Sequence, residues 1–368
     1  MNILVIFTGG TIGSAESDGY ISPNQKQGSA LLQMYTEYQS HCRQAAASDT
    51  KPNLNTESAL NTKPDFTSDA RLVCFDCVSP YTILSENLDG SHIHKLADCI
   101  HTHMRKPDKN YDGIIITHGT DTLQYTAAGL YHLFFDCTLP IVLVSSNYVL
   151  EDARANGFAN IAAAVSFIRQ HLGSGIYVAY QNNSTEGELG PVYIHYGNRV
   201  LPYGIYSDTL YSVNDMYYCK MLPQTHKEYV SYETYALHDM SVSASVHHSP
   251  ADYSKLQKNS GILMLYVAPG MYYPEPEAGM KAILLITYHS GTLPTDCADF
   301  CHFVMQAHAM GIPVYVLGTQ NSSSEDADMS SVDNTQIPYE STSRYEALHL
   351  QLLPVMSPVE AYMQLLLS

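Results

Sequence analysis

Short apolar runs that alternate with amphipathic segments are the feature of this 368-residue sequence that most constrains its fold. Each run is four to seven residues long and rich in isoleucine, valine and leucine, which is typical of strands buried on both faces of a parallel sheet. The runs lie at 3–8, 114–117, 141–146, 176–180, 262–268, 282–288 and 314–319. Helices are expected at 122–135, 151–170 and 296–310. The pattern predicts the α/β class with a doubly wound, Rossmann-like sheet.

Two polar stretches interrupt this alternation. Residues 24–70 are rich in Pro, Asn, Ser and Thr and predict a long mobile excursion after the first strand. Residues 238–260 are also polar, and strand–helix alternation restarts after them. Because a chain of this length commonly forms two domains, we expect a larger N-terminal domain over 1–237, a linker over 238–260 and a smaller C-terminal domain over 261–368.

The net charge of the chain limits the classes of partner that it is expected to bind. The chain has 36 acidic and 18 basic residues, and its net charge of −18 is spread along the sequence. Nucleic acid and anionic membrane surfaces need a basic face, so neither is expected as a partner. No apolar stretch approaches the roughly 20 residues of a spanning helix. The first residues lack a secretory-signal pattern, so we expect a cytoplasmic protein. A small zwitterionic ligand stays compatible with this charge, because charge close to the site decides its binding.

The eight cysteines raise the question of a metal or redox site. Cys74 and Cys77 form a CFDC pair with His92 and His94 nearby, but zinc sites use a second ligand pair at tighter, more regular spacing. No helix start follows the pair, which disfavours a thioredoxin-like role. In a long chain without a secretory signal, buried thiols are the expected state. We therefore expect no metal.

Two loops rich in glycine and threonine follow apolar runs: TGGTIGS at 8–14 and THGTDT at 117–122. Ligands of open α/β sheets bind at the carboxyl ends of the strands, where both loops are expected. Neither loop contains lysine or arginine, and no Gly-Lys-Ser/Thr sequence follows, so a phosphate site is disfavoured. Taken alone, each loop is also explained by glycines that form a turn and threonines that cap a helix.

Together the two loops hold the groups that hydroxyl-based nucleophilic catalysis needs. A threonine hydroxyl needs a base to take its proton and hydrogen-bond donors for the developing oxyanion. Thr11 can be the nucleophile, with backbone N–H groups of the glycine turn close by. Thr120 can orient a water or relay a proton, and Asp121 can bind an ammonium group or support a base. This set fits a carbonyl substrate that carries an ammonium group.

These loops resemble, almost letter for letter, the two signature loops of the L-asparaginase/glutaminase family, especially its cytoplasmic type I branch. Further segments of the chain resemble the family as well: GYISP at 19–23, SENLDGSHIHKLA at 85–97, VLEDARANGFANI at 149–161, ITYHSGTLP at 286–294 and GIPVYVLGTQ at 311–320. The resemblance implies a flavodoxin-like sheet in the smaller C-terminal domain. It also implies a homo-oligomer, a dimer or tetramer, and no cofactor.

The resemblance implies a role for individual residues. Thr11 attacks the side-chain amide carbon of L-asparagine, ammonia leaves, and water releases L-aspartate, with L-glutamine as a lesser substrate. Tyr20 is the lid tyrosine that activates the nucleophile, while Thr120 and Asp121 belong to a second triad. The resemblance places Ser85 and Glu86 at the positions that hold the carboxylate and ammonium of the amino acid. The full set of residues for which it implies substrate binding is Gly10, Ser85, Glu86, Gly119 and Ser146.

The chain departs from the family at the lysine of the second triad. The family's GNRTTK stretch ends in this lysine, whereas residues 197–202 read GNRVLP, so Pro202 takes its position. Proline has no side-chain proton and no N–H, and therefore cannot act as a base or stabilise Asp121. Arg344 also replaces an acid near the C-terminus. Besides L-asparaginase activity, two alternatives stay open: a catalytically weak or inactive amino-acid-binding protein on the same fold, and deamidation of a different amide.

Overall fold

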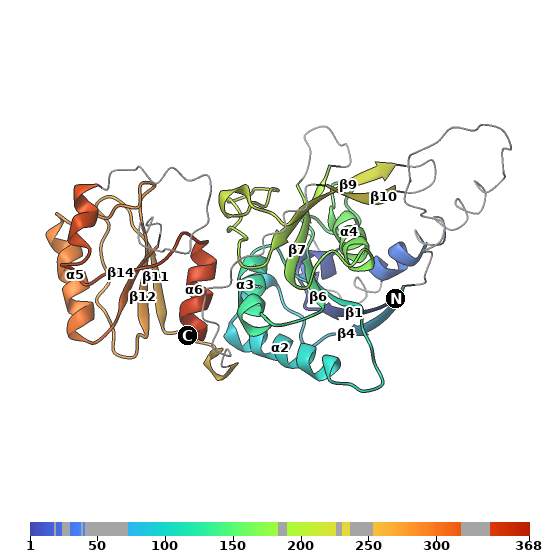
Figure 1. Ribbon diagram of the computed structural model, residues 1–368, viewed down its shortest axis with the longest axis horizontal. Coiled ribbons are helices and arrows are strands. Elements are labelled where there is room, and N and C mark those ends of the chain that lie inside the picture. Colours follow the sequence, from blue (N-terminus) through green and yellow to red (C-terminus); the bar gives the residue numbers. More distant parts are fainter. Residues whose placement is uncertain are drawn as a thin grey trace, which may run out of the picture.

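The computed structural model describes residues 1–17, 20–23, 30–37, 40, 73–182, 190–225, 230–235, 253–317 and 339–368. Figure 1 shows a large sheet with its helices in one part of the molecule and a small sheet with its helices in the other. A two-stranded hairpin, β2 (Ser14–Ser17) and β3 (Tyr20–Pro23), follows the first strand of the large sheet. No helix in the described part of the chain is long and apolar enough to cross a membrane.

Within the described residues, the large sheet has eight strands in the order β10-β9-β8-β7-β6-β5-β1-β4. The five strands from β4 to β7 pair in parallel, and β8, β9 and β10 are antiparallel to their neighbours. The four runs expected in this region are β1, β5, β6 and β7, which pair in parallel as predicted, whereas β4 and the three antiparallel strands were not predicted. Those three follow β7 without a crossover helix between them in the described residues, and such connections give antiparallel pairs. The strands are β1 (Asn2–Phe7), β4 (Cys74–Val78), β5 (Gly113–Thr117), β6 (Pro140–Val144), β7 (Gly175–Gln181), β8 (Val192–Tyr196), β9 (Cys219–Thr225) and β10 (Val230–Tyr235).

Helices cover both faces of this sheet, as the continuous apolar strands predict. Helices α2 (Gly90–Met104) and α3 (Leu123–Leu133) share one core with alternate strand residues such as Leu4 and Ile6. Helix α4 (Gly157–Arg169) packs into the opposite core with Ile3 and Val5. Because strand side chains alternate between faces, β1 contributes to both cores and its carboxyl end is held rigidly between them.

The small sheet is parallel, in the order β11-β12-β13-β14. Helix α5 (Ala298–Ala309) covers one face, and α6 (Pro358–Leu367) covers the other. Helix α6 also packs against α3, so it lies between the two sheets, as Figure 1 shows. There Nε2 of His132 on α3 lies 3.0 Å from Oε1 of Glu360 on α6, and both side chains are buried. The strands are β11 (Ile262–Tyr266), β12 (Ala282–Ile286), β13 (Val314–Leu317) and β14 (Gln351–Leu352).

Two expected segments differ from the structure. The helix expected over 151–170 begins only at Gly157, because residues 147–156 form turns that end in Asn156, the residue preceding the helix. Within the expected excursion 24–70, residues 30–37 are helical and bury Leu31 and Tyr35 in the core beside α4, and most of the remainder lies outside the described residues. Most of the expected linker 238–260 also lies outside them.

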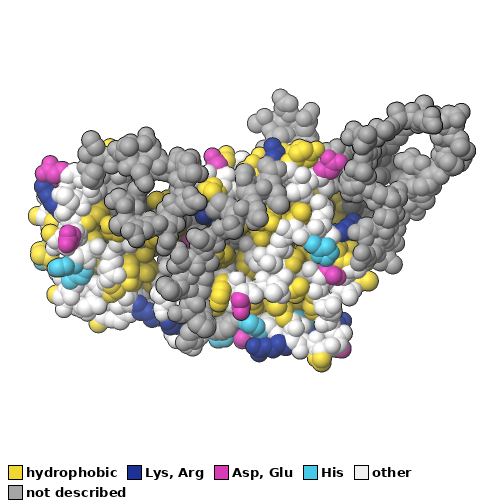
Figure 2. Space-filling view, viewed as in Figure 1, with side chains coloured by type: hydrophobic (Ala, Val, Ile, Leu, Met, Phe, Trp, Pro, Cys, Tyr) yellow, Lys and Arg dark blue, Asp and Glu magenta, His cyan; other side chains and the backbone are white. Residues whose placement is uncertain are grey.

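Charged side chains do not gather on the face drawn in Figure 2. There the described lysines, arginines, aspartates and glutamates are scattered singly or in small groups among apolar and neutral surface. This distribution agrees with the spread of charge along the sequence and gives no basic stripe on that face.

Candidate active site

The first glycine loop leaves β1 through a turn that only glycine accommodates. Gly9 and Gly10 have φ angles of 103° and 75°, which side-chain-bearing residues rarely adopt. A Cβ on Gly9 would lie 2.2 Å from the carbonyl oxygen of Ile83. The backbone N–H of Gly10 donates to that same oxygen at 3.0 Å. The loop is thereby fastened to Ile83 just before Thr11 begins the short helix η1 (Thr11–Gly13).

Three loops meet at Gly119. A Cβ on Gly10 would lie 2.3 Å from Cα of Gly119, and a Cβ on Gly119 would lie 2.4 Å from Oγ of Ser85. The backbones of Gly10 and Gly119 and the side chain of Ser85 can approach this closely because the two glycines have no side chain. Thr11 and Thr120 each follow one of these glycines, so their Cα atoms stand one residue, about 3.8 Å, from the contact. Segments more than a hundred residues apart in sequence therefore converge at the carboxyl ends of β1 and β5.

A hydrogen-bond pair links Ser85 to the second glycine loop. Oγ of Ser85, in the short helix η2 (Ser85–Asn87), donates to Oδ2 of Asp121 at 3.1 Å. Oγ1 of Thr122 donates to the backbone oxygen of Ser85 at 2.8 Å. Ser85 is buried and Asp121 is exposed, so one end of the pair is fixed and the carboxylate faces solvent. A solvent-facing carboxylate above a buried hydroxyl can receive a cationic group that arrives from outside.

His118 supports the backbone of the second loop. Its Nδ1 donates to the carbonyl oxygen of Gly119 at 2.9 Å, and its Nε2 accepts from Oγ1 of Thr126 at 2.8 Å, which fixes the ring tautomer. Burial lowers the pKa of His118 to about 4, so the ring is neutral at pH 7. Sequence reasoning classed the histidines as mostly surface or satisfied core residues, and the place of His118 next to Gly119 is the signal that could have marked it as a loop support.

Two asparagines hold the ends of the neighbouring strands. Nδ2 of Asn160 donates to the backbone oxygen of Ser145 at 2.8 Å, and its Oδ1 accepts from the N–H of Gln181 at 2.7 Å. Asn156 bridges the same region, accepting from the N–H of Asn147 and donating to the backbone oxygen of Gln181. Ser145 in turn donates to the backbone oxygen of residue 118 at 2.7 Å. The carboxyl ends of β5, β6 and β7 are therefore one connected polar frame.

The remaining predicted residues stand apart from the three-loop contact. Tyr20 begins β3, which lies against η1, but its side chain is 79% exposed. Glu86 is exposed beside buried Ser85. The hydroxyl of Ser146 is buried and donates to the backbone oxygen of Tyr148 at 2.6 Å. The structure thus brings together Gly10, Ser85, Gly119 and Asp121, flanked by Thr11 and Thr120.

The residue expected at the family's lysine position is Pro202, whose side chain has no charge. Pro202 is exposed in a loop after β8. Among the described residues, no lysine, arginine or histidine nitrogen pairs with the Asp121 side chain, whose hydrogen bond comes from Ser85. The next residue, Tyr203, has a buried hydroxyl.

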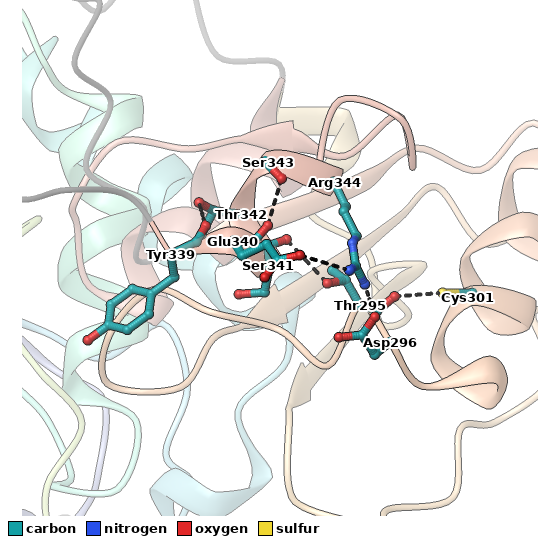
Figure 3. A network of polar contacts seen from close by, with 9 residues as sticks. All are labelled: Thr295, Asp296, Cys301, Tyr339, Glu340, Ser341, Thr342, Ser343 and Arg344. Atoms are coloured by element: carbon teal, nitrogen blue, oxygen red, sulfur yellow. Dashed lines mark hydrogen bonds and ion pairs between the residues drawn. The ribbon is translucent and has the colours of Figure 1, made fainter.

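Arg344 lies away from these loops, beside the small sheet. As Figure 3 shows, its guanidinium faces Asp296 just before α5 and Glu340 in its own short helix. The charge of Arg344 is therefore paired with two carboxylates of this chain.

Comparison with known proteins identifies the family. The family model for the N-terminal region of asparaginases matches residues 2–204. This chain belongs to the asparaginase family. An L-asparaginase of Thermococcus kodakarensis is 29% identical over 185 residues, which are 50% of this chain and 44% of that protein. A glutamyl-tRNA(Gln) amidotransferase component of Sulfurisphaera tokodaii is 32% identical over 115 residues, 31% of this chain and 24% of that protein. These matches span less than half of the relatives' lengths.

Solved structures of asparaginases share the fold of the whole chain. The L-asparaginase of Thermococcus kodakarensis superposes with a TM-score of 0.58 at 20% identity, covering 99% of this chain and 91% of that one. L-asparaginase I of Vibrio cholerae gives a TM-score of 0.60 at 19% identity, covering 100% and 92%. The large and small sheets described above are therefore those of the asparaginase fold.

Proposed function

We propose that this chain is an L-asparaginase, which hydrolyses the side-chain amide of L-asparagine to L-aspartate and ammonia. The observation that carries the proposal is the contact of Gly10, Gly119 and Ser85, which sets a threonine on each of two loops and a carboxylate on one around a single point. Family membership supports amidohydrolase chemistry at that point. L-Glutamine is a lesser substrate in this proposal, because one methylene changes binding by only about 1–3 kcal/mol.

The proposed reaction has two steps. The Thr11 hydroxyl attacks the amide carbon and gives its proton to a base, a role that the resemblance gives to Tyr20 once its exposed side chain covers the site. The C–N bond breaks, ammonia leaves with that proton, and an aspartyl ester remains on Thr11. A water oriented by Thr120 then hydrolyses the ester and restores the hydroxyl. Asp121 binds the substrate ammonium, and backbone N–H groups of the glycine turn stabilise the oxyanion.

Asp121 accepts its hydrogen bond from the neutral hydroxyl of Ser85, which favours the alternative of a weak or inactive amino-acid-binding protein. Because Pro202 supplies no proton, the chain could bind the amino acid and catalyse slowly or not at all. Amide transfer, the activity in the name of the amidotransferase relative, is a further outcome that the assay below separates through its dependence on an acceptor. We further propose two domains over 1–237 and 261–368, a homo-oligomer and a cytoplasmic location.

Ammonia release from L-asparagine tests the proposal. Wild-type protein and the Thr11→Ser variant, which keeps a hydroxyl, should release ammonia without an added acceptor, and Thr11→Ala should release none above background. If wild type releases none while saturating L-aspartate raises its melting temperature, the binding-protein alternative is correct. If L-aspartate does not change the melting temperature either, the substrate is a different amide.

A further inference from the structure

Thr122 precedes the first residue of α3, at the position where a hydroxyl commonly caps a helix, but its side chain does not cap α3. Helices α2 and α6 are capped in the ordinary way, by the side chains of Asp89 and Ser357. The hydroxyl of Thr122 instead donates to the backbone oxygen of Ser85 at 2.8 Å, 37 residues earlier in the chain. A hydroxyl that forgoes a local cap for a bond between two loops indicates a role in holding those loops together.

The backbone oxygen of Ser85 does not need this bond in order to be satisfied. It already accepts from the N–H of Leu88 at 3.0 Å, a bond that closes the turn of η2. Because one donor is enough to satisfy a buried carbonyl, the second donor adds a constraint. The bond from Thr122 therefore fixes where η2 lies relative to the second glycine loop.

Two hydrogen bonds join η2 to this loop in opposite directions. Thr122 donates to the backbone of Ser85, and the side chain of Ser85 donates to Oδ2 of Asp121 at 3.1 Å. Since the two bonds use the backbone and the side chain of the same residue, each opposes rotation about the other. Gly119 limits movement further, because even a Cβ on it would lie 2.4 Å from Oγ of Ser85.

The residues just before η2 are bound to the first glycine loop. The N–H of Gly10 donates to the backbone oxygen of Ile83 at 3.0 Å, and the N–H of Ile83 donates to that of Thr8 at 3.1 Å. Residues 83–85 thus link the two glycine loops. Loss of the Thr122 hydroxyl would loosen η2 on the second loop and leave its link to the first loop intact.

We propose that Thr122 is a positioning residue that sets substrate selectivity, because it fixes η2 at one distance from the reacting groups. In the proposed function, on which this inference rests, η2 carries Ser85 and Glu86, which hold the carboxylate and ammonium of the amino acid, while Thr11 attacks the side-chain amide. L-Asparagine has one methylene between its α-carbon and that amide, and L-glutamine has two. A fixed distance suits one of these lengths, whereas a loosened η2 accepts both.

Hydrogen exchange tests the hold on η2 without any need for turnover. Thr122→Val removes the hydroxyl and keeps the shape of the side chain, whereas Thr122→Ser keeps the hydroxyl. Thr287→Val is the matched control, because this hydroxyl also donates to a backbone oxygen of another segment, that of Leu317 at 2.9 Å, but at the ends of β12 and β13. Exchange in a peptide covering residues 83–90, measured by mass spectrometry, should be about fivefold faster in Thr122→Val and unchanged in the other two variants.

Selectivity is measured as kcat/KM for L-asparagine divided by kcat/KM for L-glutamine, since a general loss of folded protein cancels in this ratio. The ratio should fall about tenfold in Thr122→Val, which lies within the range that one methylene controls, and should return to the wild-type value in Thr122→Ser. Thr287→Val should keep the wild-type ratio even if the variant is less stable.

Each outcome decides the inference separately from the proposed function. Unchanged exchange in a folded Thr122→Val variant overturns the inference, even if wild type is an active asparaginase. Faster exchange with an unchanged ratio overturns it as well, because the hold on η2 then has no effect on selectivity. If wild type hydrolyses neither amide, the proposed function fails, and the dissociation constant of L-glutamate divided by that of L-aspartate takes the place of the kinetic ratio, with the same fall expected in Thr122→Val.

Discussion

Substituting Gly119 with alanine tests whether the site depends on the close approach of three loops. The new Cβ would lie 2.4 Å from Oγ and 2.5 Å from Cβ of Ser85, and 3.1 Å from Cα of Gly10. Ordinary van der Waals contact begins near 3.4 Å, so one loop must move by about 1 Å. Ser85 cannot simply rotate away, since its Cβ is among the clashing atoms and the residue is buried.

The displacement should reach the reacting groups. Ser85 donates to Asp121 and accepts from Thr122 through its backbone oxygen, so a shift of Ser85 moves these two residues at the end of the second loop. A misplacement of 1 Å can cost about 100-fold in rate, equivalent to about 2.7 kcal/mol of transition-state stabilisation. Forcing a methyl group into this contact should also lower the free energy of unfolding by about 1–3 kcal/mol.

Gly13→Ala is the matched control for this prediction. Gly13 lies in the first loop, its φ is outside the left-handed region, and a Cβ there meets nothing within 4 Å. Its substitution should leave kcat/KM within about twofold and change stability by no more than about 1 kcal/mol. The assays are ammonia release and urea denaturation on all three proteins. If Gly119→Ala keeps wild-type kcat/KM, or if Gly13→Ala is equally damaging, the loop contact does not organise the site.

Three further predictions concern Pro202, the contact between helices α3 and α6, and stability in acid. Pro202→Lys should raise kcat/KM about tenfold by offering Asp121 a charged donor, and a flat response means that this loop does not reach the carboxylate. Glu360→Ala should lower the free energy of unfolding by about 3–5 kcal/mol because it removes the carboxylate beside buried His132. Glu340 belongs to an exposed ion pair, so Glu340→Ala should change that free energy by under about 0.5 kcal/mol. Equal losses for the two variants in urea denaturation would contradict this prediction. Burial lowers the pKa of His118 from 6.5 to about 4 and that of His195 from 6.5 to about 3. As the pH falls, these histidines therefore become protonated in the unfolded chain before they do in the folded chain. The stability present above pH 6.5 should therefore fall as the pH drops toward 3, by on the order of 3 kcal/mol per histidine, and His195→Gln should make the fall shallower in urea titrations.

The strands that the sequence predicted are continuous apolar runs, and most of them are largely buried. Strands β5 and β6 are buried along their whole length, and such runs are continuous in sequence. Strand β8 mixes tyrosine and histidine with valine and isoleucine, and its antiparallel pairing depends on β7 and β9. The start of α4 was placed six residues too early because Asn156, which ties β6 to β7, ends a turn that has no apolar signal.

The candidate site was predictable where its chemistry sits in a turn. Gly10 and Gly119 are fixed by backbone geometry, and that requirement is visible in the sequence as glycine beside threonine. The hydrogen-bond support of Asp121 was not predictable from local sequence, because its donor, Ser85, comes from a different loop. The pairing of Ser85 with Asp121 joins positions 36 residues apart, and local patterns do not encode such a distance.

A crystal structure of the Thr11→Ala variant grown with L-asparagine tests the central claim most directly, because the variant lacks the nucleophile and should retain intact substrate. The account predicts asparagine at the meeting point of the three loops, with its ammonium on Asp121 and its side-chain amide carbon facing residue 11. Asparagine bound elsewhere, or no asparagine at this point at a saturating concentration, would contradict it.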